Sequence, residues 1–120
     1  MAVQRNYVQL IGHLGADPEI TRYDNGRAKA VFRLATNEYY RTGDGETVET
    51  TQWHRIVAWG PLAEYIAQNY HKGNWVLVQG RIQYRSYQDE DGNTRYITEI
   101  NARDCLKLTK EPSDQSEEDK

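Results

Sequence analysis

The segment 53–59 carries the side chains best suited to a binding function. It reads WHRIVAW, and successive side chains of a β-strand point to opposite faces. One face then carries Trp53, Arg55, Val57 and Trp59, and thus two indoles and a guanidinium. The other face is expected to join the core, with His54, Ile56 and Ala58. A flat aromatic surface beside a cation suits the bases and phosphates of a single nucleic-acid strand.

Burial in a core is the alternative for the two tryptophans. An isolated Trp in a strand more often belongs to a core or a subunit interface. Here Arg55 shares their face, and Ile56 and Ala58 on the other face already supply core residues. We therefore expect Trp53 and Trp59 to stack with unpaired bases.

Two tyrosines extend this expected binding surface. Tyr87 alternates with Ile82 and Tyr84, which are expected to point inward, and so shares a face with Arg85. Taken alone, that face is an ordinary solvated surface with amphipathic side chains, but its place beside a hairpin favours binding. Tyr40 lies at a strand end beside a loop, where the residues alone leave binding and local packing open.

The remaining candidate side chains are basic or titratable. Arg33 and Lys72 are assigned to backbone phosphate, although basic side chains in such settings are usually just solvated. His54 is expected to be packed and hydrogen-bonded. No metal site is expected, because His13 and His71 fall on other elements and the chain has no cysteine pair.

The charge of the chain is unevenly distributed. The formal net charge is −3, but residues 109–120 hold five acidic and two basic side chains, which leaves 13 of each in residues 1–108. A balanced body argues against tight, purely electrostatic binding of duplex DNA. Ten of the 15 basic residues are Arg, which stacks and forks onto phosphate better than Lys.

Length and cysteine content bound the class of protein. A chain of 120 residues with one cysteine, Cys105, corresponds to one domain without an intrachain disulfide, as expected in a reducing cytoplasm. No apolar run resembles a signal peptide or a membrane span. We expect a folded domain over 1–108 and an acidic, disordered tail over 109–120.

Short alternating segments separated by turn signals predict an all-β domain. The expected strands span 7–14, 28–37, 50–59, 75–87 and 94–108. A short extended piece is expected over 19–23, and a mobile loop over 41–48. One helix is expected to begin at Pro61 and to end by Gly73.

Five strands with one short helix between the third and fourth are typical of the OB-fold, a five-stranded Greek-key barrel. A β-sandwich fits the strands nearly as well, but it does not predict the lone helix. The sequence therefore favours the barrel.

A series of motifs resembles the bacterial-type single-stranded DNA-binding proteins. In chain order they are NYVQLIGHLG (6–15), DPE (17–19), LATN (34–37), WHRIVAWG (53–60), LAE (62–64), KG (72–73), GRI (80–82) and DGNTRY (91–96). Their order and spacing, over about residues 5–108, are more specific than any one of them. The resemblance implies a homotetramer, or rarely a dimer, of OB-folds that binds single-stranded DNA without sequence preference in replication, recombination and repair at the nucleoid.

The resemblance also implies roles for single residues, carried over by position. The stacking aromatics of the family fall on Tyr40, Trp53, Trp59 and Tyr87, and its phosphate contacts fall on Arg55, Arg85 and Lys72. His54 falls on a residue that packs at the subunit interface. The family commonly has Trp at the positions of Tyr40 and Tyr87 and Phe at that of Trp59, so all four remain aromatic.

The chain departs from the family at a turn and in its tail. The turn Asp24-Asn25-Gly26 lacks the proline often found there. The tail lacks both the Gly/Gln/Pro-rich linker and the acidic tip, closed by Pro and Phe, that docks replication and repair proteins in the family. Either the sequence is truncated or it is a tail-less variant, and recruitment of those partners is in question.

Two rival functions need other features. A nuclease or glycosidase needs paired carboxylates or a metal cluster in a pocket, whereas the acidic residues lie mainly in turns and the tail, so neither catalysis nor a cofactor is expected. A dimeric primosome-type OB-fold accessory protein acts mainly through protein contacts. The stacking aromatics argue against that alternative.

Overall fold

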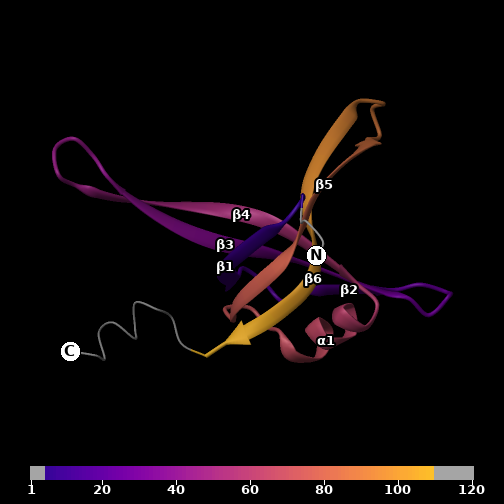
Figure 1. The fold of residues 1–120 in the computed structure, drawn as a ribbon. Coiled ribbons are helices and arrows are strands. Elements are labelled where there is room, and N and C mark those ends of the chain that lie inside the picture. Colours follow the sequence, from indigo (N-terminus) through magenta and orange to yellow (C-terminus); the bar gives the residue numbers. More distant parts are fainter. Residues whose placement is uncertain (1–4, 110–120) are drawn as a thin grey trace.

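The computed structural model describes residues 5–109, which form six strands and one helix. They are β1 (Val8–Leu14), β2 (Glu19–Arg22), β3 (Ala28–Arg41), β4 (Thr47–Trp59), α1 (Pro61–Asn69), β5 (Trp75–Gln88) and β6 (Thr94–Leu108). The sheet order is β1-β5-β6-β4-β3-β2, and β1 also pairs with β3, which closes a five-stranded barrel. The predicted barrel with one helix between its third and fourth strands is thereby confirmed, and β2 adds a short edge strand on β3 (Figure 1).

A long two-stranded arm projects from the barrel between β3 and β4 (Figure 1). The two strands pair without interruption from Lys29 opposite Trp59 to Arg41 opposite Thr47. A short turn joins them, in which the Thr42 N–H donates to the Glu46 carbonyl over 2.8 Å. The strand ends predicted at Asn37 and Thr50, and the loop predicted between them, were therefore wrong. Beyond the barrel both faces of the arm meet solvent, so alternation no longer signals a strand.

The β5–β6 hairpin forms a second arm, which leaves the barrel in a different direction (Figure 1). Its strands pair as far as Gln88 opposite Thr94. Tyr84, predicted to point inward, is 74% exposed. That prediction was wrong because Tyr84 keeps the inward side of the strand but lies past the end of the core.

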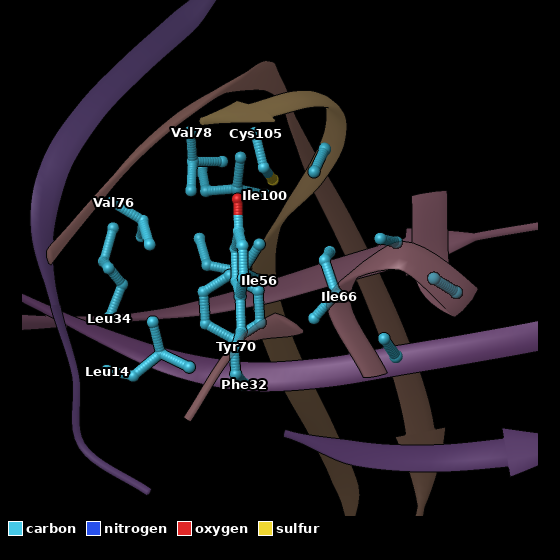
Figure 2. Close-up of a cluster of buried hydrophobic side chains, with 14 of the residues drawn as sticks. Leu14, Phe32, Leu34, Ile56, Ile66, Tyr70, Val76, Val78, Ile100 and Cys105 are labelled. Atoms are coloured by element: carbon cyan, nitrogen blue, oxygen red, sulfur yellow. The ribbon is translucent and has the colours of Figure 1, made fainter. Parts of the chain in front are cut away.

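The barrel interior is filled by alternate residues of its strands. They include Ala30, Phe32, Leu34, Ile56, Ala58, Val76, Val78 and Ile100. The ring of Tyr70, just after α1, packs edge-on against Phe32 with centroids 6.2 Å apart, and its hydroxyl points towards Ile100 and Val78 (Figure 2). Within the described residues that hydroxyl has no hydrogen-bond partner, and burial raises its pKa.

Local sequence explains how the helix and the barrel closure form. Pro61 occupies the first helical turn, and Ala63 and Ile66 are the buried face of α1. The helix ends at Asn69, before Gly73, because Tyr70 adopts extended backbone. Where β1 passes from β5 to β3, a Cβ on Gly12 would collide with the Ala35 carbonyl oxygen, so a residue without a side chain lets the barrel close there.

Candidate nucleic-acid interface

The register of β3 and β4 brings four of the predicted binding residues onto one outer face. Arg33 lies directly opposite Arg55, and Lys29 lies opposite Trp59. Trp53 precedes Arg55 by two residues on β4, so its side chain lies on the same face. The odd-numbered residues of segment 53–59 thus all face away from the core, as predicted. Val57 is nevertheless buried, with only 2% of its surface exposed. Val57 is covered on this face and offers no surface to a ligand.

Trp53 is the most accessible indole on this face, with 51% of its surface exposed. The guanidinium carbon of Arg33 lies 5.6 Å from its ring centroid. Together with Gly15 and Ala16 these two side chains line an open hollow of about 250 Å³. An exposed ring beside a cation can stack a base and attract the phosphate attached to it.

Trp59 is less available than the sequence suggests. Its ring stacks with Tyr23 at a centroid distance of 6.0 Å and an interplanar angle of 23°. The Arg27 guanidinium carbon lies 4.6 Å from the indole centroid, and the Lys29 Nζ lies 5.5 Å from it. Trp59 is therefore half-buried in a cluster formed by the chain itself, and it offers a base a smaller surface than Trp53 does.

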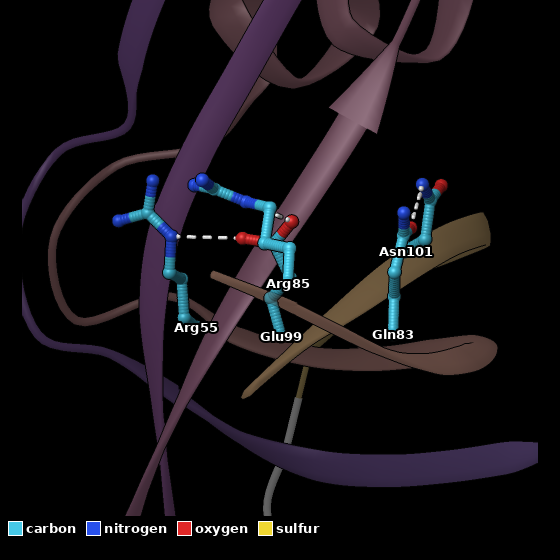
Figure 3. A network of polar contacts seen from close by, with 5 residues as sticks. All are labelled: Arg55, Gln83, Arg85, Glu99 and Asn101. Atoms are coloured by element: carbon cyan, nitrogen blue, oxygen red, sulfur yellow. Dashed lines mark hydrogen bonds and ion pairs between the residues drawn. The ribbon is translucent and has the colours of Figure 1, made fainter. Parts of the chain in front are cut away.

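A buried carboxylate joins two of the predicted arginines (Figure 3). Arg55 Nε donates to Glu99 Oε2, and Arg85 Nε donates to Glu99 Oε1, each over 3.1 Å. The Glu99 side chain is only 7% exposed. Sequence reasoning missed Glu99. Alternation places Glu99 on the same face of β6 as Ile97 and Asn101, but only the pairing of β4 with β6 brings that face to Arg55.

Two further predicted residues border this surface. Tyr87 is exposed on the β5–β6 arm, on the same face as Arg85 and opposite Arg95. Lys72 is exposed in the turn after α1, and its backbone N–H donates to Asp17 Oδ1 over 2.7 Å. This bond holds the Lys72 turn beside the Ala16 edge of the hollow.

Tyr40 is not brought together with the other aromatics. It is exposed far along the β3–β4 arm, five residues beyond Ala35, the partner of Trp53. That separation is about 16 Å along the strand. By alternation Tyr40 lies on the opposite side of the arm, whereas its neighbour Tyr39 keeps the side of Arg33 and donates from its hydroxyl to Glu49 Oε2 over 3.2 Å.

His54 lies on the core side of β4, as predicted, and is half-buried. Its Nε2 is 2.9 Å from the Thr36 hydroxyl. Burial lowers the pKa of His54, and the charge of Glu38, which is the smaller effect, acts in the opposite direction. Its place at a subunit interface stays a prediction.

Metal-binding and membrane-spanning features were also sought in residues 5–109. In that range no group of three or more His, Cys, Asp or Glu is arranged to hold a metal ion, and no helix is long and apolar enough to cross a membrane. Cys105 is buried, which raises the pKa of its thiol to about 12.

Residues 5–108 match the model of the single-strand binding protein family. The chain belongs to this family. The match covers the whole barrel, both arms and every predicted site residue, and it confirms the resemblance drawn from the motifs.

Known members of the single-strand binding protein family are similar along most of the chain. "Single-stranded DNA-binding protein 1" of Chlorobaculum tepidum is 45% identical over 109 residues, which cover 90% of this chain and 67% of the relative. The "Single-stranded DNA-binding protein" of Bacteroides thetaiotaomicron is 45% identical over 97 residues, covering 79% of this chain and 60% of the relative. A solved structure, "Plasmodium falciparum SSB complex with ssDNA", superposes with a TM-score of 0.81 at 32% identity, covering 91% of this chain and 99% of that chain.

Proposed function

We propose that this protein binds single-stranded DNA without sequence preference and thereby protects it during replication, recombination and repair. The observation that carries the proposal is the half-exposed indole of Trp53 beside Arg33, on the same face as Arg55. Each base stacked on an aromatic ring contributes about 1–3 kcal/mol, and one OB-fold covers about 4–16 nucleotides. Every base has a flat face, so stacking tolerates any sequence.

The binding surface includes Trp53, Arg55, Trp59, Arg85, Tyr87, Arg33 and Lys72, with Tyr40 contacting DNA only where the strand follows the β3–β4 arm. The similar Plasmodium falciparum structure, described as a complex with ssDNA, supports this use of the fold. The family match favours this function over a primosome-type accessory role. We place the protein in the cytoplasm at the nucleoid.

We also propose that the chain forms a homo-oligomer, a tetramer as the family resemblance implies. In support, Ile11, Leu77 and Leu106 form a continuous aliphatic row across β1, β5 and β6, with Ile11 and Leu106 exposed. Contiguous apolar patches on a surface mark interaction sites. Light scattering should give a mass near four chains, and a monomer mass would contradict the proposal.

The binding proposal is tested by fluorescence anisotropy with labelled (dT), a mixed-sequence single strand and the matching duplex. We expect similar affinities for the two single strands and weaker binding of the duplex, whose bases are already stacked. Affinity should fall as salt rises, because phosphate binding releases counterions. Preference for the duplex, or for one sequence, would contradict the proposal.

We propose that binding is passive, without catalysis. Incubation of single-stranded and duplex DNA with the protein and Mg²⁺ should leave both intact, and cleavage that copurifies with the protein would contradict this.

The predicted tail lies outside the described residues from residue 110 onward. The disorder of the tail stays a prediction, and docking of replication and repair proteins stays in question because the tail lacks the Pro-Phe tip of the family.

A further inference from the structure

We propose that Glu99 is a positioning residue that joins Arg55 and Arg85 into a single phosphodiester-binding unit. The inference rests on the proposed single-strand binding and deepens it. It predicts that the two arginines act on one phosphate of the strand and that they do so only while Glu99 holds them.

The three side chains come from three different strands of the barrel. Arg55 is on β4, Arg85 on β5 and Glu99 on β6, and each guanidinium contacts its own oxygen of the carboxylate at 3.1 Å. Two guanidinium groups that share one carboxylate must lie close together. Figure 3 shows their outer ends on the same side of Glu99.

Both bonds to Glu99 use Nε, which leaves the terminal Nη amines of Arg55 and Arg85 available. Among residues 5–109, no other hydrogen bond is formed by either guanidinium. Guanidinium N–H groups form paired, charge-assisted bonds to phosphate oxygens. Each arginine is partly exposed, by 36% and 38% of its side chain, so a phosphate in solvent can reach both.

The charges and the burial of Glu99 agree with this assignment. A buried carboxylate is costly unless it is paired and hydrogen-bonded, and Glu99 satisfies that need with both arginines. One carboxylate and two guanidinium groups carry a net charge of +1, which matches the single negative charge of one phosphodiester.

The Glu99→Gln variant separates positioning from charge. The amide oxygen accepts from only one guanidinium, and its NH₂ opposes the other, so one arginine loses its orientation. We expect about tenfold weaker binding of (dT), the loss expected for one charge-assisted hydrogen bond. If charge alone mattered, removing a negative charge would tighten binding, so unchanged or tighter binding would overturn the proposal.

Glu90→Gln is the matched control, because it makes the same charge change on the exposed tip of the β5–β6 arm. It should leave binding unchanged or slightly tighter. Thermal unfolding of both variants, measured beside wild type, checks that the fold is retained.

The salt dependence of the binding affinity gives a count of the phosphates contacted. This count does not depend on the stability of the Glu99→Gln variant. The slope of log affinity against log salt changes by about 0.7 for each phosphate of a single strand. We expect Arg55→Ala to reduce the slope by about this amount, and Arg55→Ala/Arg85→Ala/Glu99→Gln to reduce it no further. The triple variant leaves no unpaired buried carboxylate. A reduction twice as large would mean two separate phosphate contacts and would overturn the proposal.

The outcomes also distinguish this proposal from single-strand binding itself. Wild-type protein that fails to bind (dT) contradicts the proposed function. Wild-type protein that binds (dT), with Glu99→Gln equally tight, contradicts only the role of Glu99.

Discussion

The indole of Trp53 lies so close to Gly15 that no side chain fits between them. A Cβ built on Gly15 would lie 2.5 Å from Cζ3 and 2.8 Å from Cη2 of the indole. Gly15 follows β1, and its N–H donates to the Arg33 carbonyl over 3.0 Å. The turn after β1 therefore supports the Trp53 ring on which a base is proposed to stack.

Gly15→Ala should weaken single-strand binding by moving the Trp53 ring rather than by unfolding the barrel. The expected loss is up to about 1–3 kcal/mol, the value of one stacked base. Anisotropy with (dT) measures it, and the Trp emission spectrum reports the ring displacement. Gly43→Ala is the control, since a Cβ there meets nothing within 4 Å and its φ is not positive. Equal affinities for the two variants would contradict the role assigned to Gly15.

Trp53→Ala and Trp59→Ala should differ in their effect on thermal stability. Trp53→Ala should lower (dT) affinity by about 1–3 kcal/mol with little change in thermal stability, because half of the ring is exposed. Trp59→Ala should also lower the melting temperature, because Tyr23 and Arg27 lose the ring they pack on. Each loss of affinity should be the same for (dT) and mixed sequence, and a loss confined to one sequence would indicate base-specific recognition.

His54 should make the folded protein less stable in mild acid. Burial holds its folded pKa below the ordinary value of about 6.5, so the unfolded chain binds the proton more readily. Stability is therefore full above pH 6.5 and is lost as pH falls below it. Glu64 and Asp89 have lowered pKa values from their bonds to Arg22 and Arg95, so their contributions are lost only at lower pH.

Denaturant unfolding at pH 7.5 and 5.5, at one protein concentration, measures the His54 effect. Wild type should lose more stability between these pH values than His54→Gln, which retains a polar group near Thr36. Equal losses in the two proteins would show that His54 does not titrate on unfolding.

Tyr70→Phe should stabilise the protein. The buried hydroxyl has no partner among the described residues, and an unsatisfied buried polar group costs about 1–3 kcal/mol. The variant keeps the ring that packs on Phe32. We expect a gain of about 1 kcal/mol in the free energy of unfolding, measured by urea denaturation. A clear loss would mean that the hydroxyl is bonded after all.

Alternation predicts the barrel well because its two environments differ sharply. Phe32 and Ile56 are buried while their neighbours Arg33 and Arg55 face outward, so the pattern reveals both the strands and the binding face. Beyond Asn37 and Ile82 the arms are solvated on both faces. In the arms, the alternation rule therefore predicted that a strand ends too early and that Tyr84 points inward.

The contacts that shape the site lie beyond such patterns. Glu99 reads as an ordinary exposed carboxylate until the parallel pairing of β4 with β6 sets it beside Arg55. Gly15 has no side chain to signal that a tryptophan covers it. The stacking of Tyr23 on Trp59 depends on how the β2–β3 hairpin lies against β4.

A single-tryptophan variant tests the central claim most directly. Trp59→Phe/Trp75→Phe keeps Trp53 as the only tryptophan, and Trp53→Phe/Trp59→Phe keeps Trp75, whose ring stacks with His13. Titration with (dT) should quench the emission of the first variant to saturation and quench it more strongly than that of the second. Undiminished Trp53 emission at saturating (dT), with binding confirmed by anisotropy, would contradict base stacking on this face.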